Sequence, residues 1–150
     1  MSDTPQEILI KIILTMILTG IIGAEREVRN KGAGLRTHIL VGVGSALIVL
    51  TSYYIFDIYK GVTIVDPSRI ISNIVTGIGF LCAGTIIRGG AHHVSGLTTA
   101  ATLWVVSGIG MAVGAGDYSA AVIVTLVVFF VLTAVRVIER IIAAKFRDIH

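Results

Sequence analysis

The fold is decided by the stretch from Asp66 to Gly114, which reads DPSRIISNIVTGIGFLCAGTIIRGGAHHVSGLTTAATLWVVSGIGMAVG. It holds two apolar runs, Ile70–Ile87 and Leu97–Ala115, joined by a short polar turn. Each run approaches the roughly 20 residues that an α-helix needs to cross a hydrocarbon layer of about 30 Å. Glycine destabilises a soluble helix by about 1 kcal/mol relative to alanine, so its repeated use indicates close helix–helix approach. We therefore predict two membrane spans that pack tightly.

The composition of the whole chain indicates a multi-pass membrane protein in contact with the lipid bilayer. Of its 150 residues, 55% are hydrophobic and 14% are charged, and the long runs are apolar on all sides rather than amphipathic. The formal charge is +3, yet the aromatic residues do not alternate with basic ones as a nucleic-acid groove requires. We expect no nucleic-acid partner. Cys82 is the only cysteine, which excludes a disulfide within the chain and a cysteine-rich metal site.

We predict an all-α fold with five transmembrane helices in one domain of residues 1–150, with spans at about 8–24, 37–56, 70–87, 97–115 and 120–142. Basic residues concentrate on one side of these spans, namely Arg26, Arg29, Lys31, Arg36, Arg88, Arg136, Arg140, Lys145 and Arg147. The positive-inside rule places that side in the cytoplasm, with the N-terminus outside and the C-terminus inside. The acidic N-terminus predicts a retained first span in place of a signal peptide. Because the chain stops at His150, we expect no C-terminal soluble domain.

One candidate polar site, or the beginning of an ion path, lies at the outer end of the third span. Asp66, Arg69 and Asn73 can share a helical face with Gly77. Asp66 also has a structural explanation as the N-cap beside Pro67, and Asn73 as a helix–helix hydrogen-bonding residue. Thr98 and Thr99 can line a polar path or bond to backbone carbonyls of their own helix.

A second candidate site is a docking surface on the cytoplasmic side for an acidic partner or anionic headgroups. Its predicted members are Glu25, Arg26, Lys31, Arg36, Thr37, His38 and Arg88. The alternative is a loop that serves only topology, with an i,i+4 ion pair between Glu25 and Arg29.

His92 and His93 can respond to acid, because histidine titrates near neutral pH. Two adjacent histidines supply at most two of the ligands that zinc prefers, so whether a metal binds stays open. The glycines predict helix packing, at positions Gly77, Gly79, Gly84, Gly110 and Gly114. The GxxxG spacing of the last two makes a homo-oligomer plausible. No nucleophile–base pair, phosphate loop or catalytic carboxylate pair is present in the sequence, so neither an enzyme nor a cofactor is expected.

Several phrases resemble the MgtC/SapB (YhiD-like) family. They are AGLRTH at Ala33–His38, the D-P-x-R-I opening at Asp66, GIGFLxAG at Gly77–Gly84 and GLTTAATLWV at Gly96–Val105, in the family's order and spacing. The resemblance covers the membrane core. It implies a bacterial inner-membrane protein associated with low Mg²⁺, acid stress and virulence-related intracellular persistence. For one branch it implies inhibition of the ATP synthase.

Three functions follow from these patterns. The leading interpretation is a nonenzymatic regulator of a membrane complex such as ATP synthase. The second is an oligomeric channel or transporter for Mg²⁺, protons or another small ion. The third is a structural or chaperone-like membrane component.

Overall fold

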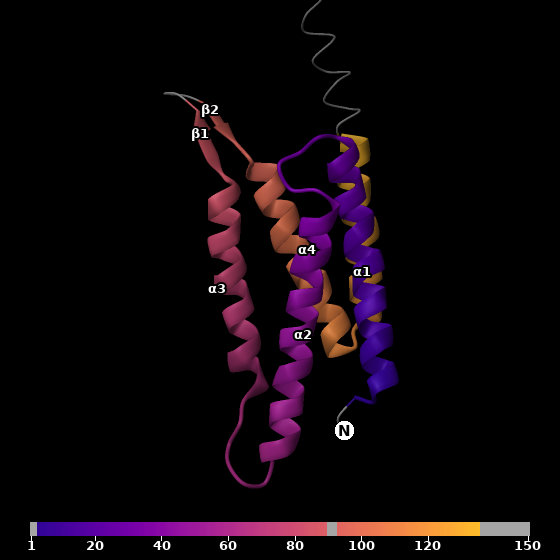
Figure 1. Ribbon diagram of the computed structural model, residues 1–150, viewed down its shortest axis with the longest axis vertical. Helices are drawn as coiled ribbons and strands as arrows, with labels where there is room; N and C mark the ends of the chain where they lie inside the picture. Colours follow the sequence, from indigo (N-terminus) through magenta and orange to yellow (C-terminus); the bar gives the residue numbers. More distant parts are fainter. Residues whose placement is uncertain (1–2, 90–92, 136–150) are drawn as a thin grey trace, which may run out of the picture.

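The computed structural model describes residues 3–89 and 93–135 of the chain. This part is a bundle of α-helices with one small β-hairpin at an end (Figure 1). Its elements in chain order are α1 (Pro5–Val28), α2 (Leu35–Tyr59), α3 (Pro67–Thr85), β1 (Ile87–Gly89), β2 (His93–Ser95), α4 (Leu97–Ala115), α5 (Tyr118–Phe130) and a π-helical turn, η1 (Val131–Val135). The all-α prediction is therefore confirmed for the bundle.

Four helical segments are long and apolar enough to cross a membrane: α1, α2, α4, and α5 together with η1. α3 has the same 19-residue length as α4 but is not among the four. Ser72, Asn73 and its glycines lower its hydropathy. Four of the five expected spans are thus matched by length and composition, the last of them as far as Val135, because residues 136–142 lie outside the described part of the chain. The span at α3 and the orientation stay predictions.

Three helices begin at side-chain caps. The Thr4 hydroxyl accepts a hydrogen bond from the backbone N–H of Glu7 at 3.3 Å, and the Glu7 carboxylate accepts one from the N–H of Thr4 at 2.7 Å. Asp66 and Asp117 accept from backbone N–H groups two and three residues further along, at 2.9 and 3.0 Å. Such caps satisfy N–H groups that the first helical turn leaves without a partner. The capping role expected for Asp66 is confirmed, and Asp117 caps α5 in the same way.

The third helix ends earlier than predicted. It stops at Thr85, and Ile87 instead opens an antiparallel hairpin in which Ile87 pairs with Ser95. The prediction that the span continues to Ile87 is wrong because the β-branched pair Ile86 and Ile87 adopts extended backbone more readily than helix. The turn expected between the third and fourth spans is thus partly a β-hairpin.

α2 and α4 lie side by side at the centre of the bundle, with α1 and α3 against them (Figure 1). Glycine permits this approach. A Cβ placed on Gly110 would overlap the carbonyl oxygen of Gly42, and one on Gly114 would lie 2.9 Å from Cβ of Val49. The apolar core beside this contact includes Ile22 and Val113, both fully buried. The glycines thus set the distance between the two central helices.

At the end of the bundle opposite the hairpin, Lys11 ties α1 to α4. Its ammonium donates to Asp3 at 2.7 Å and to the carbonyl oxygen of Gly114 at 3.1 Å. The residue is 7% exposed, so its charge is neutralised by an ion pair within the protein.

Candidate functional site

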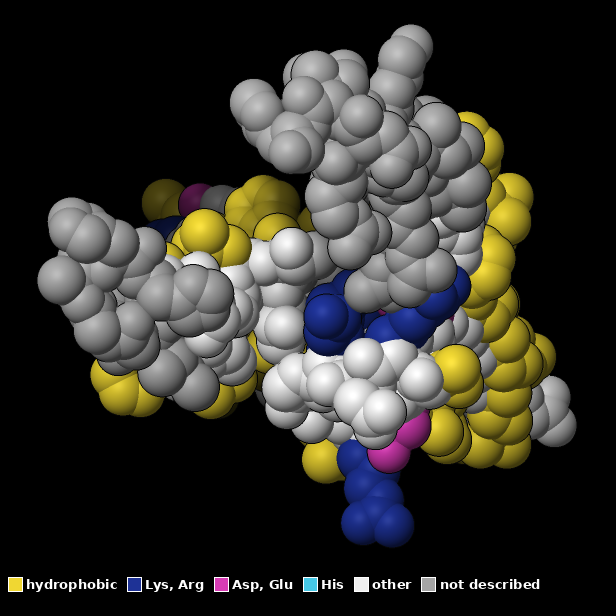
Figure 2. All heavy atoms as spheres, turned by 90° about the horizontal axis from the view of Figure 1, so that it is seen from above, with side chains coloured by type: hydrophobic (Ala, Val, Ile, Leu, Met, Phe, Trp, Pro, Cys, Tyr) yellow, Lys and Arg dark blue, Asp and Glu magenta, His cyan; other side chains and the backbone are white. Residues whose placement is uncertain are grey.

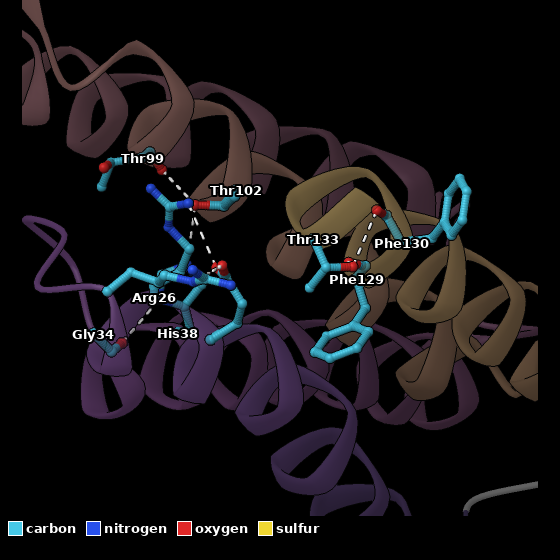
Figure 3. Close-up of polar contacts among 10 residues, drawn as sticks. Arg26, Gly34, His38, Thr99, Thr102, Phe129, Phe130 and Thr133 are labelled. Atoms are coloured by element: carbon cyan, nitrogen blue, oxygen red, sulfur yellow. Dashed lines mark hydrogen bonds and ion pairs between the residues drawn. The ribbon is translucent and has the colours of Figure 1, made fainter. Parts of the chain in front are cut away.

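Polar side chains from three helices meet at the end of the bundle that carries the α1–α2 loop and the hairpin. α1 brings Arg26 from its last turns, α2 brings His38 from its first turns, and α4 brings Thr102. All three residues are buried, with exposed fractions of 4% or less. In Figure 3, Arg26 and His38 reach toward the first turns of α4, where Thr99 and Thr102 lie. We call Arg26, His38, Thr99 and Thr102 the inner polar cluster.

His38 connects α2 to α4. Its Nδ1 lies 2.8 Å from the carbonyl oxygen of Gly34, and its Nε2 lies 3.1 Å from Oγ1 of Thr102. A carbonyl can only accept, so Nδ1 carries a proton. The Thr102 hydroxyl donates to the carbonyl oxygen of Thr99 at 2.9 Å and is also the neighbour of Nε2 at hydrogen-bond distance. The histidine is therefore held from both sides in one orientation.

Glu25 brings a buried carboxylate to the same end of α1. Arg29 Nε donates to it at 3.1 Å, and Arg26 Nη1 lies 3.5 Å from it. The predicted i,i+4 pair between Glu25 and Arg29 is thus present. The Glu25 carboxylate therefore contacts two guanidinium groups, those of Arg26 and Arg29.

Glu27 closes the α1–α2 loop, a role that the sequence analysis missed. Its carboxylate accepts a hydrogen bond from the backbone N–H of Leu35 at 2.9 Å. A Cβ on Gly34 would overlap this carboxylate, so a larger residue there would displace the Glu27 side chain. The signal in the sequence that could have indicated this role is an acidic residue eight positions before the start of α2.

Six of the seven predicted docking residues divide into an exposed group and a buried group. Lys31, Arg36 and Thr37 are exposed. Glu25, Arg26 and His38 are buried inside the bundle and do not offer a free surface. Arg88 is the middle residue of β1.

The predicted outer site is not brought together with the threonines. Asp66, Arg69 and Asn73 are all exposed and lie at the first turns of α3. Thr98 and Thr99 lie at the first turns of α4, which is at the opposite end of the bundle (Figure 1). Thr98 is exposed, whereas Thr99 is 5% exposed.

Asn73 lines a groove of about 480 Å³ between α2 and α3, together with Gly44 and Gly77. Among the hydrogen bonds of residues 3–89 and 93–135, none involves its amide. The groove is otherwise lined by apolar side chains such as Ile48 and Leu81.

The predicted packing glycines also divide. Gly110 and Gly114 face α2 within the chain, so this pair does not present a surface to a second copy. Gly77, Gly79 and Gly84 have no atom of another element within 4 Å of an added Cβ. Within the described part of the chain, α2 therefore lies against Gly110 and Gly114 but not against the three glycines of α3.

The predicted histidine pair lies partly within the described residues. His93 opens β2, and His92 lies outside the described residues. Within residues 3–89 and 93–135, no three His, Cys, Asp or Glu side chains come together as a metal site would require.

Comparison with known proteins identifies the family. The family model described as the MgtC family matches residues 12–141. YhiD of Escherichia coli K12, named "Putative magnesium transporter YhiD", is 49% identical over 114 residues, covering 75% of this chain and 53% of that protein. Protein SapB of Bacillus subtilis is 39% identical over 118 residues, with coverage of 77% and 50%.

Protein MgtC of Salmonella typhimurium 14028s is 43% identical over 121 residues, with coverage of 80% of this chain and 48% of that protein. The chain spans about half the length of these curated relatives. No solved structure is significantly similar to it. The resemblance in the four sequence phrases is thereby confirmed, and the chain belongs to the MgtC family.

Proposed function

We propose that the protein is a nonenzymatic, multi-pass protein of the bacterial inner membrane that contributes to Mg²⁺ homeostasis and acid-stress adaptation by regulating another membrane complex. The family and the name of the E. coli relative support the link to magnesium. ATP synthase is the candidate complex that the family resemblance suggests.

The observation that carries the regulator is the closed interior of the bundle. α2 and α4 touch through glycine backbone at Gly42 and Gly110, and apolar residues such as Ile22 and Val106 fill the space beside them. The buried Thr15 and Thr19 hydroxyls donate to carbonyls of their own helix at 2.8 and 2.7 Å. A single chain packed in this way offers an ion few free oxygen ligands.

The exposed part of the basic end is the proposed contact with the regulated complex. Lys31 and Arg36 are exposed there, and in the proposed orientation they face the cytoplasm. An acidic surface of the partner, or anionic headgroups around it, would complement these charges.

The proposed topology has five spans, with α3 as the fifth, the N-terminus outside and the C-terminus inside. It is tested with single cysteines in a Cys82→Ala background. Val28 and Val62 are each 81% exposed; Val28 ends α1 just before the α1–α2 loop, and Val62 follows α2, so they lie at opposite ends of the bundle. A cysteine at Val62 should react with a membrane-impermeant maleimide in whole cells, and one at Val28 only after lysis. The reverse pattern would overturn the orientation.

A second candidate is an oligomeric channel or transporter for Mg²⁺, protons or another small ion. The groove with Asn73, Gly44 and Gly77 favours it, because a neighbouring copy at this face would enclose the amide. In this alternative Asp66 and Arg69 stand at the entrance, Thr98 and Thr99 at the exit, and His92 and His93 confer the response to pH.

Flux in purified proteoliposomes separates the two functions. Asp66→Asn is the test variant, and Asp117→Asn is its matched control because both carboxylates cap helices. Saturable Mg²⁺ or proton flux that Asp66→Asn alone abolishes would displace the regulator. Absence of flux, together with ATP synthase capture that Lys31→Gln/Arg36→Gln weakens, would support it.

A further inference from the structure

A polar cavity of about 610 Å³ lies at the end of the bundle that carries the α1–α2 loop and the hairpin. Its charged lining residues in the described part of the chain are Arg26 and Lys31, and none is acidic. Figure 2 shows Lys and Arg side chains gathered at the centre of this end of the molecule. The cavity therefore presents two cationic groups, of which Arg26 is also paired with Glu25 outside the lining.

The hydroxyl of Thr99 is available inside this cavity. Thr99 lines it and is 5% exposed. Its carbonyl oxygen accepts from Thr102, but no hydrogen bond of the residues 3–89 and 93–135 uses its hydroxyl. The hydroxyl therefore faces the cavity and can donate to an acceptor that a ligand supplies.

The start of α4 adds backbone donors to the same wall. Gly96 is the N-cap, at φ +88°, and provides no side-chain cap. The first intrahelical bond goes from the N–H of Ala100 to the carbonyl of Gly96, so the N–H groups of Leu97, Thr98 and Thr99 have no carbonyl partner within the helix. The positive end of this 19-residue helix favours an anion at that position.

We propose that this cavity binds a phosphate group. A phosphate carries up to two negative charges and three strong acceptor oxygens. Arg26 and Lys31 would neutralise the charge, while the Thr99 hydroxyl and the free N–H groups would donate to the oxygens. The opposite wall is apolar, with Val131, Leu132 and Val135, and can cover the part of the ligand that adjoins the phosphate. The phosphate belongs either to a lipid headgroup or to a soluble molecule.

The test measures dissociation constants of the full chain purified in one detergent. Inorganic phosphate, titrated at constant ionic strength against chloride, probes the soluble source. Short-chain phosphatidic acid, with phosphatidylcholine of the same chain length as its control, probes the lipid source. Binding in detergent does not depend on the orientation in the membrane or on the choice between regulator and channel.

The test variant is Lys31→Gln/Thr99→Val, which removes one charge and one hydroxyl from the cavity. Its matched control is Lys60→Gln/Thr63→Val, which removes one charge and one hydroxyl from exposed positions that follow α2 at the other end of the bundle, outside the cavity lining. The test variant should weaken binding by at least about tenfold, since charge-assisted hydrogen bonds are lost. The control should change it less than about twofold, because long-range attraction to exposed charges is screened by salt.

Each outcome decides the proposal. Saturable binding of inorganic phosphate with this variant pattern supports a soluble ligand, and binding of phosphatidic acid alone with the same pattern supports a lipid headgroup. Binding of neither probe, or equal weakening by both double variants, overturns the phosphate site. If Thr99→Val prevents folding, Lys31→Gln alone in the exposed loop should weaken binding in the same direction, and an unchanged constant would be decisive against the site.

Discussion

Replacing Gly110 with alanine tests the contact that positions the two central helices. The added Cβ would overlap the carbonyl oxygen of Gly42 and lie 2.9 and 3.0 Å from its carbonyl carbon and Cα. Ordinary van der Waals contact begins at 3.4 Å, and all three atoms are backbone, so no side chain can rotate away. α2 and α4 must therefore move apart, and the contacts that the core makes across them weaken.

The magnitude follows from two opposing effects. An extra methyl group in a well-packed core costs about 1–3 kcal/mol, and the rigid neighbour argues for the upper end. Alanine gains about 1 kcal/mol over glycine in a helix. We expect Gly110→Ala to lower the free energy of unfolding by about 2 kcal/mol.

Gly108→Ala is the matched control, because it lies on the same helix and nothing approaches within 4 Å of its added Cβ. It should gain about 1 kcal/mol from helix propensity alone. The assay is unfolding by dodecyl sulfate in mixed micelles, followed by the fluorescence of Trp104, the single tryptophan, on α4. Equal free energies of unfolding for the two variants would refute the close approach of α2 and α4.

Three further predictions concern the polar contacts. Thr102→Val should lower the free energy of unfolding by about 1–3 kcal/mol, because His38 loses the partner of its Nε2. Thr102→Ser keeps the hydroxyl and should retain most of the stability. A valine variant as stable as the wild type would contradict the contact. Asp3→Asn should lower the free energy of unfolding more than Lys11→Met does, because it leaves the buried Lys11 ammonium without its carboxylate, whereas the Asp3 side chain is 27% exposed and tolerates the loss of its partner. The cost of Asp3→Asn should stay below the about 3–5 kcal/mol of fully buried pairs. The backbone N–H three residues on and the Ser hydroxyl two residues on lower the pKa of the Asp117 carboxyl below its ordinary 3.8, so its cap stabilises above pH 3.8 and is lost as pH falls through the lowered value; the stability difference between wild type and Asp117→Ala should shrink below pH 3.8 in an acid titration and not at higher pH.

The sequence predicted the bundle well where local physics decides it. Apolar runs bounded by capping residues gave α4 its bounds, Leu97–Ala115, without change. Asp66 caps its helix as expected. These features depend on residues a few positions apart, which a sequence displays directly.

Burial at the inner end could not be predicted in the same way. Arg26 stands in a segment whose charge and glycine content are typical of a solvated loop, and His38 follows it at the predicted start of the second span. Their burial results from α1 continuing to Val28 and from a hydrogen bond between residues 64 positions apart. No local pattern contains that pairing. The same limit applies to GxxxG, which marks a close contact but not whether its partner is α2 or a second chain.

The two ends of the bundle differ in how far a perturbation can spread. At one end, the carboxylates of Asp66 and Asp117 bond only to the first turns of their own helices and are exposed. At the other, the bond between His38 and Thr102 joins α2 and α4 through buried groups, and the buried Arg26 of α1 reaches toward the same turns of α4 (Figure 3).

A ligand or partner that moves Arg26 or Thr99 therefore acts on the helix pair held together at Gly42 and Gly110. Binding at the exposed caps would change one helix start. Regulation of another complex needs the first kind of coupling, which is why we place it at the inner end.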